Sequence, residues 1–227
     1  MQQAKNIISS IAEKTNEVVL FHSASGKDSI ALLDLLYPKF KRIVCVYMYV
    51  VPNLEHINRY ISYAQKKYPR AEFIQVPHYG LFSYYKTGYL GCTQRNIRKY
   101  NLSELCDMIR AKYGIEWACF GFKQSDGMNR RIMLRTYEHN AICDKTHKFF
   151  PLSEYKNSDI IDYIEQNDLI RPEKYGNTQS AGTNISDINY LLYLRKNFPQ
   201  DIKKIINEFP MVERILFEYD YERAETE

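Results

Sequence analysis

One short stretch near the amino terminus constrains the fold of this chain more than any other. Residues 18–21 are apolar, residues 22–27 are small or polar, and an apolar-rich segment begins at Ile30. This order predicts a buried strand, a tight turn and a helix whose first turn holds Asp28 and Ser29. Backbone N–H groups at a helix N-terminus lack partners and carry the positive end of the helix dipole. The stretch therefore predicts an anion site suited to a phosphate chain.

The predicted turn also supplies side chains that can contact an anion. Lys27 adds a full positive charge, and hydroxyl groups come from three serines, Ser23, Ser25 and Ser29. An ordinary turn between a strand and a helix, capped by Asp28, is the alternative interpretation. A Walker A loop is excluded, because it would need Gly in place of Phe21 and Ser or Thr in place of Asp28.

Composition excludes several other classes of protein. With 227 residues, of which 45% are hydrophobic, the chain can bury one full core. The 31 basic and 27 acidic residues nearly balance, so global charge indicates neither a nucleic acid nor an anionic membrane as partner. Five cysteines without a CxxC pair fit reduced thiols and a cytoplasmic setting. No signal peptide and no long apolar run are present, so the chain is expected neither to be exported nor to span a membrane.

Strand and helix patterns alternate along the first half of the chain. Helices are predicted over residues 4–14, 28–37, 52–68 and 102–113, and strands over residues 18–21, 42–50, 71–76 and 116–121. This alternation predicts a Rossmann-like open, mostly parallel α/β sheet flanked by helices. The carboxyl ends of such strands border the ligand crevice.

Other segments are less regular. Residues 77–100, rich in Tyr, Gly and Lys, predict a long functional loop or lid without a helix. A helix begins near residue 158, with Asn157 or Ser158 as N-cap. Residues 185–227 predict two or three helices that are broken at Pro199 and Pro210.

Gly26-Lys27-Asp28-Ser29 resembles the PP-loop, Ser-Gly-Gly-x-Asp-Ser, of the adenine nucleotide α-hydrolase-like superfamily. That superfamily includes ATP pyrophosphatases, the small subunit of sulfate adenylyltransferase and phosphoadenosine phosphosulfate reductases. Ala24 and Ser25 replace the first Ser and the first Gly of the motif.

Two later segments are similar to the reductase branch of that superfamily. Residues 121–130 resemble its Gly-x-Arg-x-x-Glu-Ser-x-x-Arg segment, keeping Gly121 and Arg130, with Lys123 and Asp126 replacing Arg and Glu. Lys keeps the charge but lacks the planar fork that grips phosphate with two hydrogen bonds. Residues 149–164 are similar to a Pro-Leu segment followed by a helix in the same branch.

The resemblance implies that residues 1–176 bind ATP or a related adenine nucleotide, accompanied by Mg²⁺, with residues 177–227 as a helical extension. The extension would pack on that domain or form a dimer contact. The implied reaction is adenylyl or pyrophosphatase chemistry at the α-phosphate, with an unidentified acceptor and a possible place in sulfur metabolism. The expected catalytic residues are Lys27, Lys123 and Arg130. The expected nucleotide-binding residues are Ser23, Ser25, Gly26, Lys27, Asp28, Ser29, Gly121, Arg95, and Tyr47 and Met48 beside the adenine. The alternatives are that Tyr47 and Met48 are ordinary core residues and that Arg95, Arg98 and Lys99 are solvated surface charges.

Cysteine positions separate this reaction from its main alternative. A phosphoadenosine phosphosulfate reductase needs a nucleophilic thiolate, which the family carries near its carboxyl end, but no cysteine follows Cys143 here. Residues 91–99 resemble a Cys-Cys-x-x-x-Lys segment found beside iron–sulfur clusters, but Cys92 stands alone, so no cluster is expected. Cys92 is expected to be exposed beside Arg95. A non-catalytic nucleotide-binding or interaction protein is the third interpretation.

Overall fold

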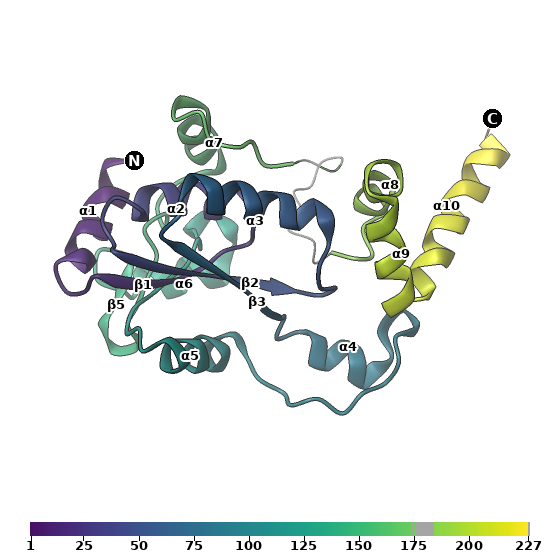
Figure 1. Ribbon diagram of the computed structural model, residues 1–227, viewed down its shortest axis with the longest axis horizontal. Helices are drawn as coiled ribbons and strands as arrows, with labels where there is room; N and C mark the ends of the chain where they lie inside the picture. Colours follow the sequence, from purple (N-terminus) through teal and green to yellow (C-terminus); the bar gives the residue numbers. More distant parts are fainter. Residues whose placement is uncertain (174, 176–183, 227) are drawn as a thin grey trace.

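A computed structural model describes residues 1–173, 175 and 184–226 (Figure 1). Among these residues, six strands form one sheet in the order β3-β2-β1-β4-β6-β5, and only the β5–β6 pair is antiparallel. The strands are β1 (Glu17–Phe21), β2 (Arg42–Tyr49), β3 (Ala71–Pro77), β4 (Ala118–Cys119), β5 (Ile142–Cys143) and β6 (Lys148–Phe149). The predicted Rossmann-like, mostly parallel α/β fold is confirmed.

Helices cover both faces of the sheet (Figure 1). They are α1 (Gln2–Ala12), α2 (Lys27–Leu36), α3 (Glu55–Lys67), α4 (Leu81–Thr87), α5 (Leu102–Tyr113), α6 (Met128–Arg135), α7 (Asn157–Gln166), α8 (Ile188–Asn197), α9 (Pro199–Glu208) and α10 (Met211–Thr226). Because side chains alternate along a strand, Val18 and Leu20 pack toward α1, α2 and α3. Val19 and Phe21 pack on the opposite face, with α5 and α6. In the described part of the chain, no helix is long and apolar enough to cross a membrane.

Some predicted elements differ from the structure. Residues 77–100, predicted to lack a helix, contain α4 and the 3₁₀ turn η1 (Tyr89–Gly91). Leu81 and Tyr85 lie one turn apart and are buried, and α4 ends at Gly88, which has a φ of +66°. The many tyrosines obscured this short apolar face, because tyrosine has no clear place in a hydrophobic pattern.

The short elements after β4 were also missed or misplaced. Strands β5 and β6 have two residues each, which is too short for an alternating pattern to be recognised. Helix α7 begins after Lys156, whose backbone N–H donates to Asp159 Oδ2 at 2.7 Å, so Asn157 and Ser158 lie inside the helix rather than at its cap. Pro199 starts α9 instead of breaking a helix, since proline is well tolerated in a first turn.

The carboxyl-terminal helices pack against the rest of the molecule. Apolar residues of α8, α9 and α10, including Leu191, Ile205 and Val212, belong to the same core cluster as α2 and α3. The predicted boundary at residues 176 and 177 lies outside the described residues. The division into a domain and an extension stays a prediction.

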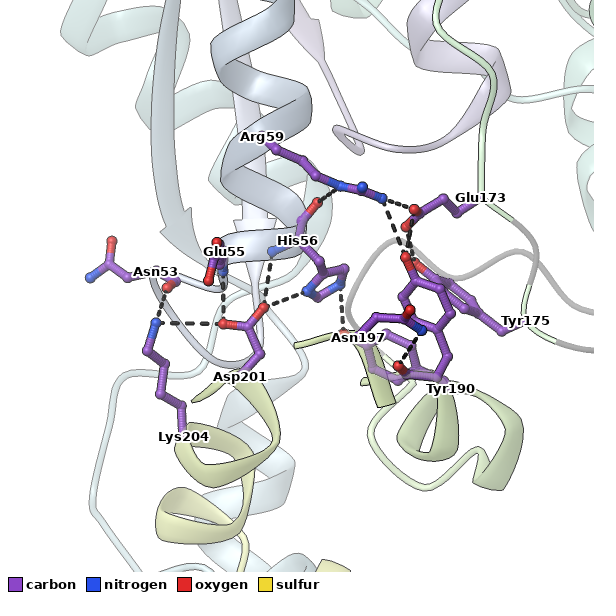
Figure 2. A network of polar contacts seen from close by, with 11 residues as sticks. Asn53, Glu55, His56, Arg59, Glu173, Tyr175, Tyr190, Asn197, Asp201 and Lys204 are labelled. Atoms are coloured by element: carbon purple, nitrogen blue, oxygen red, sulfur yellow. Dashed lines mark hydrogen bonds and ion pairs between the residues drawn. The ribbon is translucent and has the colours of Figure 1, made fainter. Parts of the chain in front are cut away.

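A buried polar network joins α9 to the start of α3 (Figure 2). Asp201, which is fully buried, accepts backbone N–H hydrogen bonds from Glu55 at 2.8 Å and from His56 at 2.9 Å. A carboxylate from a distant helix thus satisfies the N-terminal N–H groups of α3 and complements its dipole. Residues far apart in sequence therefore hold each other in place.

The His56 ring completes this network. His56 Nδ1 lies 2.9 Å from Asp201 Oδ2, and Nε2 lies 2.9 Å from the Tyr190 hydroxyl. A carboxylate can only accept, so Nδ1 carries the proton and Nε2 accepts from Tyr190. Burial lowers the pKa of His56 more than Asp201 raises it, so the ring stays neutral. Burial would raise the pKa of Asp201, but hydrogen bonds from His56 and Glu55 hold it below its ordinary value.

We expect Asp201→Ala to lower the free energy of unfolding by about 3 kcal/mol or more, because it leaves several buried N–H groups without acceptors. Asp220→Ala is the matched control, since it removes a carboxylate whose partner, Arg195, lies at the surface. Urea denaturation followed by circular dichroism measures both. Equal, small effects of the two substitutions would contradict a structural role for Asp201.

Candidate functional site

A cavity of about 390 Å³ lies at the carboxyl ends of β1, β2 and β4. On one side of β1 the sheet continues with β2 and β3, and on the other side β1 pairs with β4. The strand order therefore reverses between β1 and β4. Ligands of open α/β sheets bind in such crevices. The lining residues are Phe21, His22, Ser23, Asp28, Ser29, Val46, Tyr47, Met48, His78, Leu102, Phe120, Gly121, Phe122, Asp126 and Arg130.

The loop between β1 and α2 forms the polar end of the cavity. Ser29 Oγ accepts the Ser23 backbone N–H at 2.8 Å and lies 2.8 Å from Ser23 Oγ. A Cβ on Gly26 would collide with Ser23 Oγ, so glycine is needed for this close approach. Ala24 has a φ of +52°, a conformation that non-glycine residues rarely adopt. The loop is therefore held tightly in one shape, which is the state a preformed anion site needs.

The first turn of α2 faces this end of the cavity. Gly26 is the N-cap in an extended conformation, and no side chain of the described residues caps the helix. The ten-residue helix thus presents backbone N–H groups and the positive end of its dipole. The predicted strand, turn and helix are present, and their use as an anion site stays a prediction.

Five charged side chains form an alternating chain behind and along the cavity wall. Lys27 Nζ lies 3.2 Å from Asp28 Oδ2, and Asp28 Oδ1 lies 2.8 Å from Lys123 Nζ. Lys123 Nζ lies 3.1 Å from Asp126 Oδ1, and Asp126 Oδ2 lies 2.9 Å from Arg130 Nη1. The chain begins and ends on a cation and carries one net positive charge.

Lys123 is the buried centre of this chain, with only 1% of its surface exposed. The resemblance implied that it contacts a substrate anion, but it does not line the cavity and instead joins two carboxylates that do. Burial would raise the pKa of Asp126, but the Lys123 backbone N–H and the Lys123 and Arg130 charges hold it below its ordinary value. Lys123 therefore positions Asp28 and Asp126 and helps to keep Asp126 ionised.

Arg130 reaches the cavity from α6. Its guanidinium lies 3.7 Å from the centre of the Phe122 ring and pairs with Asp126, while 43% of its side chain stays exposed. Contacts on two sides fix the plane of the guanidinium and leave other N–H donors free for an anion. This placement agrees with the role expected for Arg130.

Aromatic rings form the apolar end of the cavity. Phe21 and Phe120 stack with centres 4.5 Å apart, and Phe122 lies 5.3 Å from Phe120. Met48 packs on the same side of the sheet. The three phenylalanines were not among the predicted site residues, although each stands at or after the end of a predicted strand, where side chains reach the crevice. The cavity thus combines an aromatic wall suited to an apolar ring with groups suited to an anion.

Two histidines also line the cavity. His22 is buried, and its Nδ1 accepts the Ala24 backbone N–H at 3.0 Å. Burial lowers the pKa of His22 to about 3, so the ring is neutral and its proton lies on Nε2. Burial also lowers the pKa of His78, whose Nδ1 accepts the Gly80 backbone N–H at 3.0 Å. Each ring shapes the backbone beside the cavity through its Nδ1 atom.

Most of the expected site residues come together here. Seven line the cavity, namely Ser23, Asp28, Ser29, Tyr47, Met48, Gly121 and Arg130. Ser25, Gly26 and Lys27 belong to the same loop and first helical turn without lining the cavity. A Cβ on Gly121 would lie 3.0 Å from Asp28 Cβ, so this glycine lets α2 approach the end of β4.

Arg95 and Cys92 lie elsewhere. Arg95 does not line the cavity; it pairs with Glu208 at 3.1 Å and stacks on Tyr85. Cys92, expected to be an exposed thiolate, is 4% exposed, and its thiol donates to the Tyr84 carbonyl oxygen. Burial raises the pKa of this thiol, and the Glu208 charge adds to the effect of burial and outweighs that of Arg95. The expectation for Cys92 was wrong because Arg95 is already paired with an acidic residue.

The sequence profile of the phosphoadenosine phosphosulfate reductase domain matches residues 18–176. The chain belongs to this family. The family is part of the PP-loop adenine nucleotide α-hydrolase-like superfamily, so the resemblance seen in the sequence is confirmed. No curated protein matched the chain in a sequence comparison.

Among solved structures, the chain is similar to the U34-tRNA thiolase NcsA from Methanococcus maripaludis with its [4Fe-4S] cluster. The identity is 15%, the TM-score is 0.46, and the alignment covers 95% of this chain and 78% of that chain. That protein holds a [4Fe-4S] cluster, and the expectation that this chain has no iron–sulfur cluster is withdrawn. Ligands of a cluster meet through the fold rather than through sequence spacing, so the lack of a Cys-Cys pair was too weak a reason for the exclusion.

We expect Lys123→Met to lower the free energy of unfolding by about 3 kcal/mol, because it removes the buried cation that contacts both Asp28 and Asp126 and leaves each carboxylate with one partner at the cavity edge. Both carboxylates keep some water, which places the loss at the lower end of the range for broken buried pairs. Lys27→Met is the matched control, since Lys27 contacts only the outer oxygen of Asp28. Thermal and urea denaturation measure the difference. A stability loss confined to Lys27→Met would show that Lys123 is not the residue that holds the wall together.

We also expect the free energy of unfolding to decrease as the pH is lowered, because of His22. The folded protein keeps His22 neutral, whereas His22 of the unfolded chain binds a proton near pH 6.5. Protonation therefore favours the unfolded chain, and the folded protein loses stability as pH falls below that value. Between pH 7 and pH 5 the loss through His22 is about 2 kcal/mol. His22→Asn, which retains an acceptor for the Ala24 N–H, should remove this part of the pH dependence. An unchanged dependence in urea denaturation at the two pH values would contradict the assignment.

Proposed function

We propose that the cavity binds ATP or a related adenine nucleotide and that the protein catalyses substitution at the α-phosphate, with pyrophosphate as the leaving group. One observation carries this proposal: a single cavity joins the open N-terminus of α2 to an aromatic wall and to Arg130. A nucleotide has the same two ends, a planar ring and a polyphosphate. Membership in a family named for a reductase of an adenine nucleotide supports it.

The phosphate chain would lie at the polar end of the cavity. N–H groups of the loop and of the first turn of α2, with the hydroxyls of Ser23 and Ser29, would contact the β- and γ-phosphates. An acceptor atom forms a bond to the α-phosphorus while the bond from that phosphorus to the bridging oxygen breaks. Pyrophosphate then leaves with added negative charge, which donors fixed before the reaction stabilise best.

The charged side chains would have separate roles in binding the phosphates and Mg²⁺. Arg130 would contact the α-phosphate or the acceptor anion, and Lys27 would add positive charge beside the leaving group. Asp28 and Asp126 face the same cavity, and one or two carboxylates together with phosphates are the ligands that Mg²⁺ prefers. Lys123 would act through these two carboxylates as a positioning residue.

The nucleotide base would lie against the apolar end. Met48, Phe120 and Phe122 offer flat or flexible apolar surfaces there, and Tyr47 and Met48 are among the last residues of β2, which ends at Tyr49. These contacts would suit a purine ring. The acceptor is not specified by them, because it would approach the α-phosphate from the Arg130 side.

The positions of the cysteines favour this reaction over reduction of a sulfonucleotide. None of the described residues that line the cavity is a cysteine. Cys45 and Cys119 are buried in β2 and β4, where burial raises the pKa of both thiols. A thiolate that attacks sulfur would therefore need to come from outside the described cavity wall.

Isothermal calorimetry with ATP and Mg²⁺ tests the binding step. Arg130→Ala should weaken binding about 10- to 100-fold, as expected when a hydrogen bond to a charged group is lost. Arg131→Ala is the matched control, because this neighbouring arginine is exposed and does not line the cavity. No heat with ATP, ADP, AMP or adenosine phosphosulfate would remove the proposal.

Release of labelled pyrophosphate and adenylate, measured with a panel of acceptors, tests the chemical step. Cys92→Ser should keep this turnover, since Cys92 is remote from the cavity lining, whereas Arg130→Ala should lose most of it. Loss of turnover in Cys92→Ser with nucleotide binding intact would instead favour thiol chemistry.

A further inference from the structure

The net positive charge of the chain is concentrated in one segment. Residues 73–103 contain four basic residues, Lys86, Arg95, Arg98 and Lys99, and no Asp or Glu. The remaining 27 basic residues are balanced by the 27 acidic residues of the chain. The same segment holds Phe82 and five tyrosines, Tyr79, Tyr84, Tyr85, Tyr89 and Tyr100. Cations interleaved with aromatic rings are the composition of surfaces that bind single-stranded nucleic acids.

The structure gathers part of this segment around a surface groove. Helix α4 and the chain that leads from it to α5 run along one side of the molecule, below the sheet in Figure 1. A groove of about 430 Å³ lies between them, lined by Phe82, Tyr85, Lys86, Gln94, Arg95 and Asn96. We call it the α4 groove.

Cations surround the aromatic rings of the α4 groove. Lys86 Nζ and Lys99 Nζ lie 5.8 Å and 5.9 Å from the centre of the half-buried Phe82 ring. Lys86, Arg98 and Lys99 are exposed, and none of them pairs with an acidic side chain in the described part of the chain. Arg95 differs, because Glu208 neutralises it while it stacks on Tyr85. Two cations without an acidic partner, Lys86 and Lys99, therefore lie beside one accessible ring, and Arg98 adds a third exposed charge in the same segment.

The segment that forms the groove leaves the candidate active site and returns to it. His78, just before α4, and Leu102, at the start of α5, both line the cavity. Tyr79, 36% exposed, stacks on His78 with ring centres 4.3 Å apart. The Tyr100 hydroxyl donates to the Pro77 carbonyl oxygen at 3.1 Å and so ties the returning chain to the end of β3. A partly exposed aromatic ring thus lies against the cavity lining, at the start of the segment that forms the groove.

We propose that the α4 groove binds a single-stranded nucleic acid, with Lys86, Arg98 and Lys99 contacting phosphates and the Phe82 and Tyr79 rings stacking on bases. An acidic protein segment would use the cations but has no need of two accessible rings. The binding itself is independent of the nucleotide chemistry proposed above. Only its consequence, delivery of an acceptor to the neighbouring cavity, depends on that chemistry.

Binding of labelled twelve-nucleotide oligo(U) and oligo(dT), measured by fluorescence anisotropy without ATP, tests this proposal. The double variant Lys86→Ala/Lys99→Ala should weaken binding at least tenfold. It should also make the slope of log K against log salt concentration less negative by about 1.4, or about 0.7 for each lost phosphate contact. Phe82→Leu, which keeps an apolar side chain but removes the ring, should weaken binding with an unchanged slope. The matched control, Lys5→Ala/Lys39→Ala, removes two exposed lysines elsewhere and should leave binding unchanged.

Three results would overturn the proposal. One is an equal loss in the control variant, which would mean diffuse electrostatic attraction. Another is full binding by Phe82→Leu, which would exclude stacking. The third is equally tight binding of a labelled oligoglutamate at the same groove, which would indicate an acidic protein partner. Calorimetry with ATP on the same variants keeps the two proposals apart, since groove variants should bind ATP normally whether or not they bind an oligonucleotide.

Discussion

The ammonium group of Lys123, held between the carboxylates of Asp28 and Asp126, is the interaction on which the candidate site depends. Asp28 lies in the first turn of α2, which follows β1, and Asp126 lies in the 3₁₀ turn η2 (Gln124–Asp126), which follows β4. The two strands flank the point where the strand order reverses, so one buried cation joins both sides of the crevice. Removing an ammonium from water costs several kcal/mol, and two close carboxylates are needed to offset that cost. The arrangement is therefore stable only when both sides of the crevice are in place.

A second buried charge supports the far side of the same crevice. Asp201 caps α3, the helix that follows β2, and it comes from α9 in the carboxyl-terminal part of the chain. Arg59, one turn further along α3, pairs with Glu173 (Figure 2). Its guanidinium also stacks on Phe198. These contacts hold the carboxyl-terminal helices against α3. The position of α3, the helix that follows the cavity-lining strand β2, is thus fixed by residues that no local sequence pattern connects.

Periodicity and turn chemistry predicted the fold well. The strand, turn and helix around Gly26 and the alternation of later elements follow from spacing alone, because parallel strands and amphipathic helices leave strong local patterns. The same reasoning placed Asp28 and Ser29 in the first turn of the helix that follows β1, and the structure brings them into one cavity with Arg130. Elements of two residues, such as β5 and β6, leave no such pattern.

The environment of each charge was harder to predict. Nothing in the sequence near Lys123 shows that its side chain is buried while Arg130, seven residues later, is exposed. That difference arises from neighbours supplied by α2 and by the turn after β4. The same is true of Cys92 and Arg95, which are close in sequence. Glu208, from a distant helix, neutralises the arginine that was expected to lower the pKa of the thiol. Burial and pairing are tertiary properties, so a motif predicts which groups meet more reliably than it predicts their ionisation.

The alternating charges also explain how a site rich in carboxylates can accept an anion. The alternating chain consists, in sequence order, of Lys27, Asp28, Lys123, Asp126 and Arg130. It carries one net positive charge, and a cation stands at each end. Each internal member already has two opposite neighbours, whereas each terminal cation has only one. A polyphosphate can therefore contact the ends of the chain without separating the pairs in its middle, and the wall of the cavity keeps its shape as the ligand enters. A site preorganised in this way has little reorganisation to carry out as negative charge develops on a leaving group.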